Sequence, residues 1–186
     1  MFTEGRCEVW TGQTSQVLDT IKKEQRYVVK RAYVDQKYKE TAWSFQEAYR
    51  YLAEAVKERL PRPADAESPV WVYRDAGYIG AGADIHYMKL GVPVEDILFF
   101  DLRKWNRILN LSYIGESKEE ERQFEKWLKS RGVHHNTDVF STAFYPIEKR
   151  KIRDSWRRLL EDQELEARYT QGMVWEIRKD WITEVR

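Results

Sequence analysis

Val-Trp-Thr-Gly-Gln-Thr, residues 9–14, is the stretch on which the fold depends, and it has a counterpart near the other end of the chain. There, residues 170–176 read Thr-Gln-Gly-Met-Val-Trp-Glu. Each stretch sets a tryptophan beside a glutamine, a threonine and a glycine in a context typical of strands. We expect the two strands to lie side by side in one sheet, so that their polar groups share a hollow.

The residues between these two stretches alternate between helical and extended patterns. Apolar side chains three or four positions apart predict helices over residues 15–25 and 44–60, and three more that begin near Asp101, Ser117 and Pro146. Apolar, β-branched and aromatic runs predict strands over residues 27–34, 70–73, 85–90, 97–100 and 173–177, followed by a polar tail. The sequence therefore predicts a single α+β domain over residues 1–186, with a central, mostly antiparallel sheet flanked by helices.

Three of the helix starts carry capping signals. Ser44 with Glu47, and Ser117 with Glu120, have the spacing of a capping box, in which the two residues satisfy each other's free backbone N–H groups. Asp101 stands directly before a helical pattern and can cap it with its carboxylate. These signals predict where the second, third and fourth helices begin.

Composition and charge narrow the classes of protein to which the chain can belong. With 32 basic and 31 acidic residues the net charge is +1, which gives no general electrostatic case for nucleic-acid or membrane binding. No apolar run approaches the roughly 20 residues of a membrane helix, and the first residues do not resemble a secretory signal. The single cysteine, Cys7, cannot form an internal disulfide, so we expect a cytoplasmic protein.

Aromatic residues are the unusual part of the composition, with 8 Trp, 11 Tyr and 7 Phe. Rings of this kind bury large areas, and an aromatic-rich core explains them most simply. The alternative is a cleft that stacks planar ligand rings such as nucleobases or nicotinamide.

Several motifs that would indicate chemistry are absent or incomplete. Gly77, Gly80 and Gly82 are in the wrong order for a dinucleotide fingerprint and indicate a hairpin or loop, which can also be a mobile loop over a cleft. His134 and His135 are adjacent, and neighbours on a strand would point to opposite faces, so a solvated loop is favoured over a shared metal site. No serine or cysteine lies in a nucleophile elbow, so triad hydrolase chemistry is unsupported.

Two polar groupings leave alternatives open. Asp84 and His86 share a strand face and form either a general-base pair or a surface hydrogen bond. The densest basic run extends from Lys149 to Arg158. At helical spacing, Arg150, Arg153 and Arg157 line one face, which either contacts phosphates or is simply a solvated surface.

Ordered motifs along nearly the whole chain resemble a family of small bacterial proteins catalogued as a domain of unknown function. The motifs are Trp-Thr-x-Gln at residues 10–13, Trp-x-Tyr at 71–73, Asp101 with Trp105 and Leu-Asn at 109–110, Ser-Trp at 155–156, and Gln-x-x-x-Trp-Glu at 171–176. Where this family commonly shows Asp-Leu-Arg, the chain has Asp-Ile-His at residues 84–86. The resemblance implies no particular activity.

A second resemblance concerns architecture. Trp10 and Thr11, followed by a short helix that ends near Gln25, look like the opening of ADP-ribosyltransferase-like domains, in which the first strand contacts the ribose of NAD. The last strand of that class carries a glutamate that orients the nicotinamide ribose. Gln171 stands near that place, with Glu176 as the alternative. A glutamine supplies no negative charge to an oxocarbenium-like transition state.

Three functions follow as hypotheses. The first is an NAD-binding, ADP-ribosyltransferase-like domain that modifies a protein or nucleic acid. In it, the cofactor is held by Trp10, Thr11, Gln13, Arg31 and Tyr73, and the ribose is positioned by the catalytic candidates Gln171 and Glu176. The second is a non-catalytic nucleotide- or partner-binding protein, favoured by glutamine in place of glutamate. A nucleic-acid-binding module is a third option that rests on the basic run, and the neutral net charge argues against it.

Overall fold

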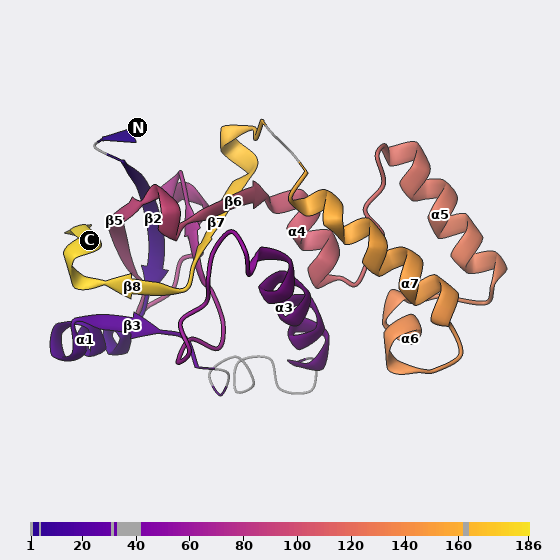
Figure 1. Ribbon diagram of the computed structural model, residues 1–186, viewed down its shortest axis with the longest axis horizontal. Coiled ribbons are helices and arrows are strands. Elements are labelled where there is room, and N and C mark those ends of the chain that lie inside the picture. Colours follow the sequence, from indigo (N-terminus) through magenta and orange to yellow (C-terminus); the bar gives the residue numbers. More distant parts are fainter. Residues whose placement is uncertain (1, 4, 31, 33–41, 162–163) are drawn as a thin grey trace. The chain divides into compact units, whose positions relative to one another are not determined.

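The computed structural model describes residues 2–3, 5–30, 32, 42–161 and 164–186. The chain divides into two compact units (Figure 1). Unit 1 takes residues 1–39, 56–99 and 166–186, and unit 2 takes residues 40–55 and 100–165. The predicted α+β class with a central antiparallel sheet and flanking helices is confirmed, whereas the single domain over residues 1–186 stays a prediction.

The main sheet has the strand order β6-β7-β4-β2-β5-β9, with the short β1 paired to β2. The strand bounds are β1 (Phe2–Thr3), β2 (Arg6–Gln13), β4 (Val70–Tyr73), β5 (His86–Pro93), β6 (Leu98–Asp101), β7 (Thr170–Val174) and β9 (Ile182–Val185). The pairs of β2 with β4 and β5, of β4 with β7, and of β5 with β9 are antiparallel. The prediction that the opening and closing strands are neighbours is wrong, because β4 pairs with both and separates them.

One face of this sheet carries the core of unit 1. Val9 lies opposite Leu90, and Val70 lies opposite Val174, and all four are buried. Helix α1 (Ser15–Glu24) adds Val17 and Ile21 to the same cluster. Because side chains alternate across a strand, residues one position away, such as Trp10 and Tyr73, belong to the opposite face.

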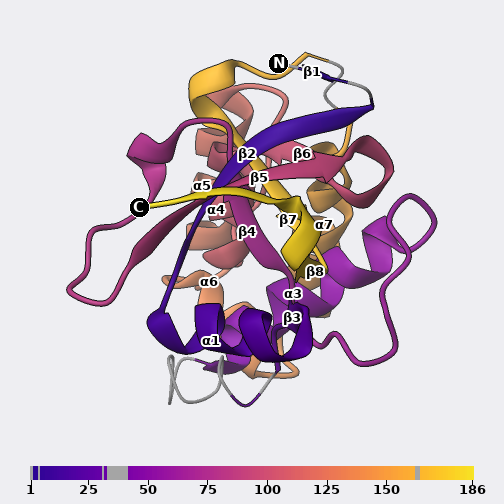
Figure 2. The same cartoon turned by 90° about the vertical axis from the view of Figure 1, so that its left-hand side faces the viewer.

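A two-stranded sheet lies beside α1 and consists of β3 (Arg26–Val28) and β8 (Glu176–Arg178) (Figure 1, Figure 2). The single strand predicted over residues 173–177 is therefore two strands, β7 and β8, that belong to different sheets. The break falls at Trp175, which is 4% exposed and donates its indole N–H to the Leu60 carbonyl at 2.9 Å. This bond to a distant residue fixes Trp175 outside both ladders. The predicted polar tail also contains a strand, β9.

Unit 2 is built from helices around two buried tryptophans, Trp105 and Trp156. Trp105 stacks with Tyr49 at 6.0 Å between ring centroids, and Trp156 stacks with Phe140 at 5.6 Å. The helices are α3 (Ala42–Val56), α4 (Leu102–Leu109), α5 (Lys118–Ser130), α6 (Asn136–Ser141) and α7 (Pro146–Ser155). The last residue of α3, Val56, belongs to unit 1. Short 3-10 turns occur in both units at η2 (Ala76–Tyr78), η3 (Val94–Asp96), η4 (Trp156–Leu159), η5 (Ala167–Tyr169) and η6 (Lys179–Trp181).

The capping signals are correct for α4 and α5 and wrong for α3. The Ser117 hydroxyl accepts a hydrogen bond from the Glu120 backbone N–H at 3.1 Å, which is one half of the predicted capping box, and the Glu120 carboxylate accepts from the Glu116 backbone N–H and the Tyr113 hydroxyl. Helix α3 begins at Ala42, so Ser44 lies inside its first turn. Glu47 instead forms ion pairs with Arg50 and with Arg153 of α7. Glu47 therefore pairs both with a residue of its own helix and with one distant in sequence.

The cap of α4 gives a pH-dependent prediction. Asp101 is 7% exposed, and it accepts a 2.7 Å bond from the Arg103 backbone N–H and further bonds from the Arg103 guanidinium. Burial raises the pKa of Asp101, but these bonds outweigh burial and hold the pKa below its ordinary value of 3.8. The stabilisation is therefore fully present above pH 3.8 and is lost as the pH falls through the lower pKa of the folded protein.

We expect Asp101→Ala to lower the free energy of unfolding by about 1–2 kcal/mol near neutral pH, since it removes the cap. The difference from the wild type should shrink in acid. Asp101→Asn retains a capping oxygen and should lower the free energy of unfolding less than Asp101→Ala does. Urea unfolding at neutral and acidic pH checks this, and an equal loss at both would contradict a charged cap.

Candidate functional site

Trp10, Tyr73 and Gln171 form a continuous row across three neighbouring strands. Trp10 of β2 is the register partner of Tyr73 of β4, and Tyr73 is the partner of Gln171 of β7. On the other side of β2, the row continues from Trp10 to Lys89 and then to Glu184. Directly opposed residues point to the same face of a sheet, so the row brings an amide, two aromatic rings and two charges onto one surface of unit 1.

Gln171 is the most unusual member of this row. Its side chain is 3% exposed, and the amide Nε2 lies 3.4 Å from the Tyr73 hydroxyl. Among the residues that the structure describes, the amide Oε1 has no hydrogen-bond partner. Exchanging the two ends of the amide would leave Nε2 unpaired instead. A buried polar atom without a hydrogen-bond partner lowers the free energy of unfolding by about 1–3 kcal/mol. The unpaired oxygen of Gln171 therefore needs either a structural reason or a bound ligand to account for it.

Cations surround the partly exposed indole of Trp10. Lys89 Nζ lies 5.9 Å and Arg186 Cζ 5.1 Å from the ring centroid, within the range of cation–π attraction. Lys89 also pairs with Glu8 at 2.7 Å, and Arg186 pairs with Glu184 at 2.5 Å. Surface pairs of this kind are worth at most about 1 kcal/mol, so an anion on this face can compete for both cations.

The segment after β4 lies over the same face of the sheet. Tyr78 of η2 faces Tyr73 with ring centroids 6.3 Å apart and planes at 20°. A Cβ added at Gly12 would lie 2.3 Å from Cγ2 of Ile79, so glycine is needed for this close approach. The glycine-rich stretch is therefore a loop packed on the sheet, and it places a second tyrosine beside the row.

Two of the predicted cofactor ligands, Thr11 and Gln13, point to the opposite face from Trp10. The Thr11 hydroxyl donates to the Trp71 carbonyl at 2.9 Å and accepts from Gln13 Nε2 at 2.8 Å. Thr11 is 1% exposed, and its hydroxyl joins β2 to β4. Arg31, the predicted pyrophosphate ligand, lies outside the described residues.

Glu176, the alternative catalytic residue, is held by arginines. Its carboxylate lies 2.5 Å from Arg26 and 3.4 Å from Arg178, and 18% of its side chain is exposed. Arg26 also pairs with Asp65 at 3.1 Å. In this position the carboxylate ties β8 to β3, whereas Gln171 belongs to the main sheet.

Asp84 and His86 meet Ser15 at the first turn of α1. The Ser15 hydroxyl lies 2.5 Å from Asp84 Oδ1 and 2.9 Å from His86 Nε2, and the Ser15 backbone N–H also donates to Asp84. The hydrogen bonds from Ser15 lower the pKa of Asp84. Asp84 thus satisfies a backbone N–H at the start of α1, and the Ser15 hydroxyl lies between the carboxylate and the imidazole.

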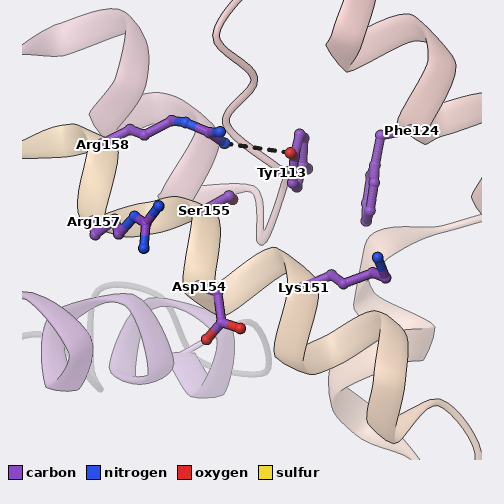
Figure 3. Close-up of a pocket in the computed structure, with 7 residues that line it drawn as sticks. All are labelled: Tyr113, Phe124, Lys151, Asp154, Ser155, Arg157 and Arg158. Atoms are coloured by element: carbon purple, nitrogen blue, oxygen red, sulfur yellow. Dashed lines mark hydrogen bonds between the residues drawn. The ribbon is translucent and has the colours of Figure 1, made fainter.

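Unit 2 contains a hollow of about 330 Å³ that none of the residues predicted to bind NAD lines, although Arg157 of the predicted basic face does. Its walls come from the basic run and from two rings, as Figure 3 shows: Tyr113, Phe124, Lys151, Asp154, Ser155, Arg157 and Arg158. Arg153, expected to share a free face with Arg150 and Arg157, is instead paired with Glu47. The basic run is therefore divided between an internal ion pair and this hollow.

Within the described ranges, no group of three or more His, Cys, Asp or Glu side chains is placed to hold a metal ion. His134 and His135 are exposed before α6. Across those same residues, no helix has the length and apolar character needed to cross a membrane.

The comparison with protein families decides where the chain belongs. The family model described as "Domain of unknown function (DUF3841)" matches residues 8–183. The chain belongs to this family. The matched residues include Trp10, Tyr73 and Gln171 and the whole of unit 2. No curated protein and no solved structure matches the DUF3841 chain.

Several features of these sites were not found from the sequence. Tyr78, Lys89 and Arg186 approach the row from other segments of the chain, and Ser15 meets Asp84 only in the folded protein. The hollow could have been found from the sequence, because Lys151, Ser155 and Arg158 recur at helical spacing and so share one helix face. This face lies one position along from the one predicted for Arg150, Arg153 and Arg157.

Proposed function

We propose that this DUF3841 protein binds a nucleotide, with NAD as the fitting dinucleotide, on the face of the main sheet that carries Trp10, Tyr73 and Gln171. The observation that carries the proposal is the buried amide oxygen of Gln171, which has no partner among the described residues and lies in register with two aromatic rings.

The chemistry of the row matches a nicotinamide ribose. Gln171 Oε1 is buried in the ligand-free protein, so binding requires the covering side chains to move; a carboxamide or a ribose hydroxyl can then donate the hydrogen bond that this oxygen lacks, and Gln171 Nε2 can donate in return. Planar rings stack on tyrosine and tryptophan, each stacked base being worth about 1–3 kcal/mol. Lys89 and Arg186, which are near Trp10, can contact the pyrophosphate.

The same residues favour binding over catalysis. An ADP-ribosyl transfer needs a negative group near the developing oxocarbenium ion, and Gln171 is neutral. Glu176 carries a charge, but Arg26 and Arg178 neutralise it. Non-catalytic nucleotide binding is therefore our first proposal. The alternative is ADP-ribosyltransferase-like activity on a protein or nucleic acid. An assay for the release of nicotinamide from NAD distinguishes this activity from binding alone.

The test is a titration of the full chain with NAD, nicotinamide mononucleotide and AMP. Binding is measured by calorimetry and by the shift in melting temperature. NAD at 100 times its Kd should stabilise the protein by about 2.7 kcal/mol. We expect nicotinamide mononucleotide to bind better than AMP, because Gln171 and Tyr73 would hold the nicotinamide end.

Trp10→Ala should weaken NAD binding at least about tenfold through lost stacking. The matched control is Trp43→Ala, which removes a tryptophan that is 40% exposed on α3 and should leave binding unchanged. The absence of any NAD effect on the wild type, or equal affinities of the wild type and Trp10→Ala, would refute the proposal.

A further inference from the structure

The hollow in unit 2 is built from segments that meet only in the folded chain. Lys151, Ser155 and Arg158 follow one side of α7 and η4, while Tyr113 and Phe124 face them from the loop after α4 and from α5 (Figure 3). All seven lining residues belong to unit 2, so a single compact unit forms the site.

The charges of the lining residues favour an anion. Lys151, Arg157 and Arg158 outnumber the one carboxylate, Asp154. Burial, together with the hydrogen bond donated to Glu120, raises the pKa of Tyr113, so its hydroxyl stays neutral. Counted over its seven lining residues, the hollow of about 330 Å³ has more cations than carboxylates, while Arg157 and Arg158 also pair with carboxylates outside the lining.

Two of the three cations can turn toward a ligand, and the third is fixed. Arg158 is 15% exposed and donates to the Ile114 carbonyl at 2.7 Å and to Glu116 at 3.0 Å. Arg157 is 75% exposed in a surface pair with Glu161 at 3.3 Å, which is weak. Lys151 contacts the ring of Trp127 and has no ion pair within the described part of the chain.

The aromatic walls exclude a stacked base. Tyr113 and Phe124 stack on each other, with centroids 4.0 Å apart and planes at 14°. Arg158 lies 5.7 Å from the Tyr113 ring, and Trp127 lies 5.2 Å from the Phe124 ring. Since the rings already have partners, this hollow selects by charge and hydrogen bonding.

From this geometry we propose that the hollow binds a small phosphorylated polyol, such as a sugar phosphate. Lys151 and Arg157 hold the phosphoryl group, because charged donors bind phosphate oxygens strongly. Asp154 accepts hydrogen bonds from the hydroxyls, since a carboxylate is an acceptor only. The hollow holds more than inorganic phosphate alone, and Asp154 is unfavourable toward a bare anion. An extended nucleic-acid backbone fits less well, because Arg153 of the basic run is engaged with Glu47.

Calorimetric titration of the full chain with glucose 6-phosphate, inorganic phosphate and glucose tests the proposal. Glucose 6-phosphate should bind more tightly than phosphate, and glucose should give no signal. Lys151→Gln and Arg157→Gln should each weaken glucose 6-phosphate binding by about tenfold, the usual effect of losing a charged hydrogen bond. Arg150→Gln, which changes an exposed residue of α7 outside the lining, is the matched control and should have no effect.

Asp154→Ala separates this proposal from general attraction to a basic surface. It should tighten binding of inorganic phosphate, since a like charge is removed, and weaken binding of glucose 6-phosphate, since the hydroxyls lose their acceptor. Melting curves would show that the variants fold. The proposal is overturned if glucose 6-phosphate gives no heat, if Asp154→Ala changes both ligands in the same direction, or if Arg150→Gln weakens binding as much as Lys151→Gln. The proposal would also be overturned if the chain bound a single-stranded oligonucleotide in a salt-sensitive way and if Arg150→Gln and Lys151→Gln weakened that binding equally.

Discussion

Trp156→Ala is expected to lower the free energy of unfolding of unit 2 by about 3–5 kcal/mol, the usual loss for a fully buried tryptophan. The side chain is 0% exposed and packs on Phe140 and on Tyr51, with ring centroids 5.6 and 5.1 Å away. Its indole N–H donates to the Ser112 carbonyl at 2.8 Å, so truncation leaves both a cavity and an unpaired carbonyl. Urea unfolding followed by circular dichroism measures the loss.

Two further variants isolate the cause of that loss. Trp156→Phe retains a ring and removes the hydrogen bond to Ser112, and it should have a smaller effect than alanine. Trp43→Ala, at a side chain that is 40% exposed, should change stability by no more than about 0.5 kcal/mol. A loss below about 1 kcal/mol for Trp156→Ala would contradict the role given to this tryptophan in the core of unit 2.

The same variant tests whether residues 1–186 fold as one domain. Hydrogen exchange in Trp156→Ala should lose protection in both units together if the chain unfolds as a single cooperative domain. Loss confined to residues 40–55 and 100–165 would show that the units unfold separately, and the single-domain prediction would then be wrong.

Gln171→Leu is expected to remove NAD binding while it stabilises the free protein. Leucine is close to glutamine in size and has no polar atom to satisfy. Replacing a buried amide whose oxygen lacks a partner should therefore raise the free energy of unfolding by about 1 kcal/mol. NAD affinity should fall more than about tenfold, because the hydrogen bonds to the nicotinamide end are lost. Chemical unfolding without ligand and calorimetry with NAD measure the two effects.

Met173→Leu is the control for this substitution. Met173 lies two residues along β7, is 0% exposed, and keeps its volume on mutation to leucine, so stability should change by less than about 1.5 kcal/mol and NAD binding should persist. If Gln171→Leu is less stable than the wild type, the amide is satisfied in the folded protein. If the variant binds NAD normally, the row does not hold this ligand.

Much of the fold follows from local patterns in the sequence. The apolar run at residues 70–73 coincides with β4, and the caps at Asp101 and Ser117 are where their residue types predict. The errors lie where a distant partner decides. Leu60 fixes Trp175 between two sheets, and Arg153 draws Glu47 away from a capping box. Such bonds leave no periodic signal in the sequence.

The candidate site was predictable in part. Trp10, Tyr73 and Gln171 were singled out from the sequence, and the structure places them in one row. Alternation along a strand should already have separated Trp10 from Thr11, because neighbours point to opposite faces. The unpaired oxygen of Gln171 could not be predicted, since it depends on what every surrounding segment offers as a donor.

The order of segments in unit 1 has a consequence for synthesis on the ribosome. β7 and β9 belong to residues 166–186, which follow the whole of unit 2 along the chain. While those residues are still untranslated, β4 lacks one neighbour and β6 has none to join it to the sheet. The helices of unit 2 emerge earlier and can pack during translation, whereas the sheet is completed only after its last strands are made.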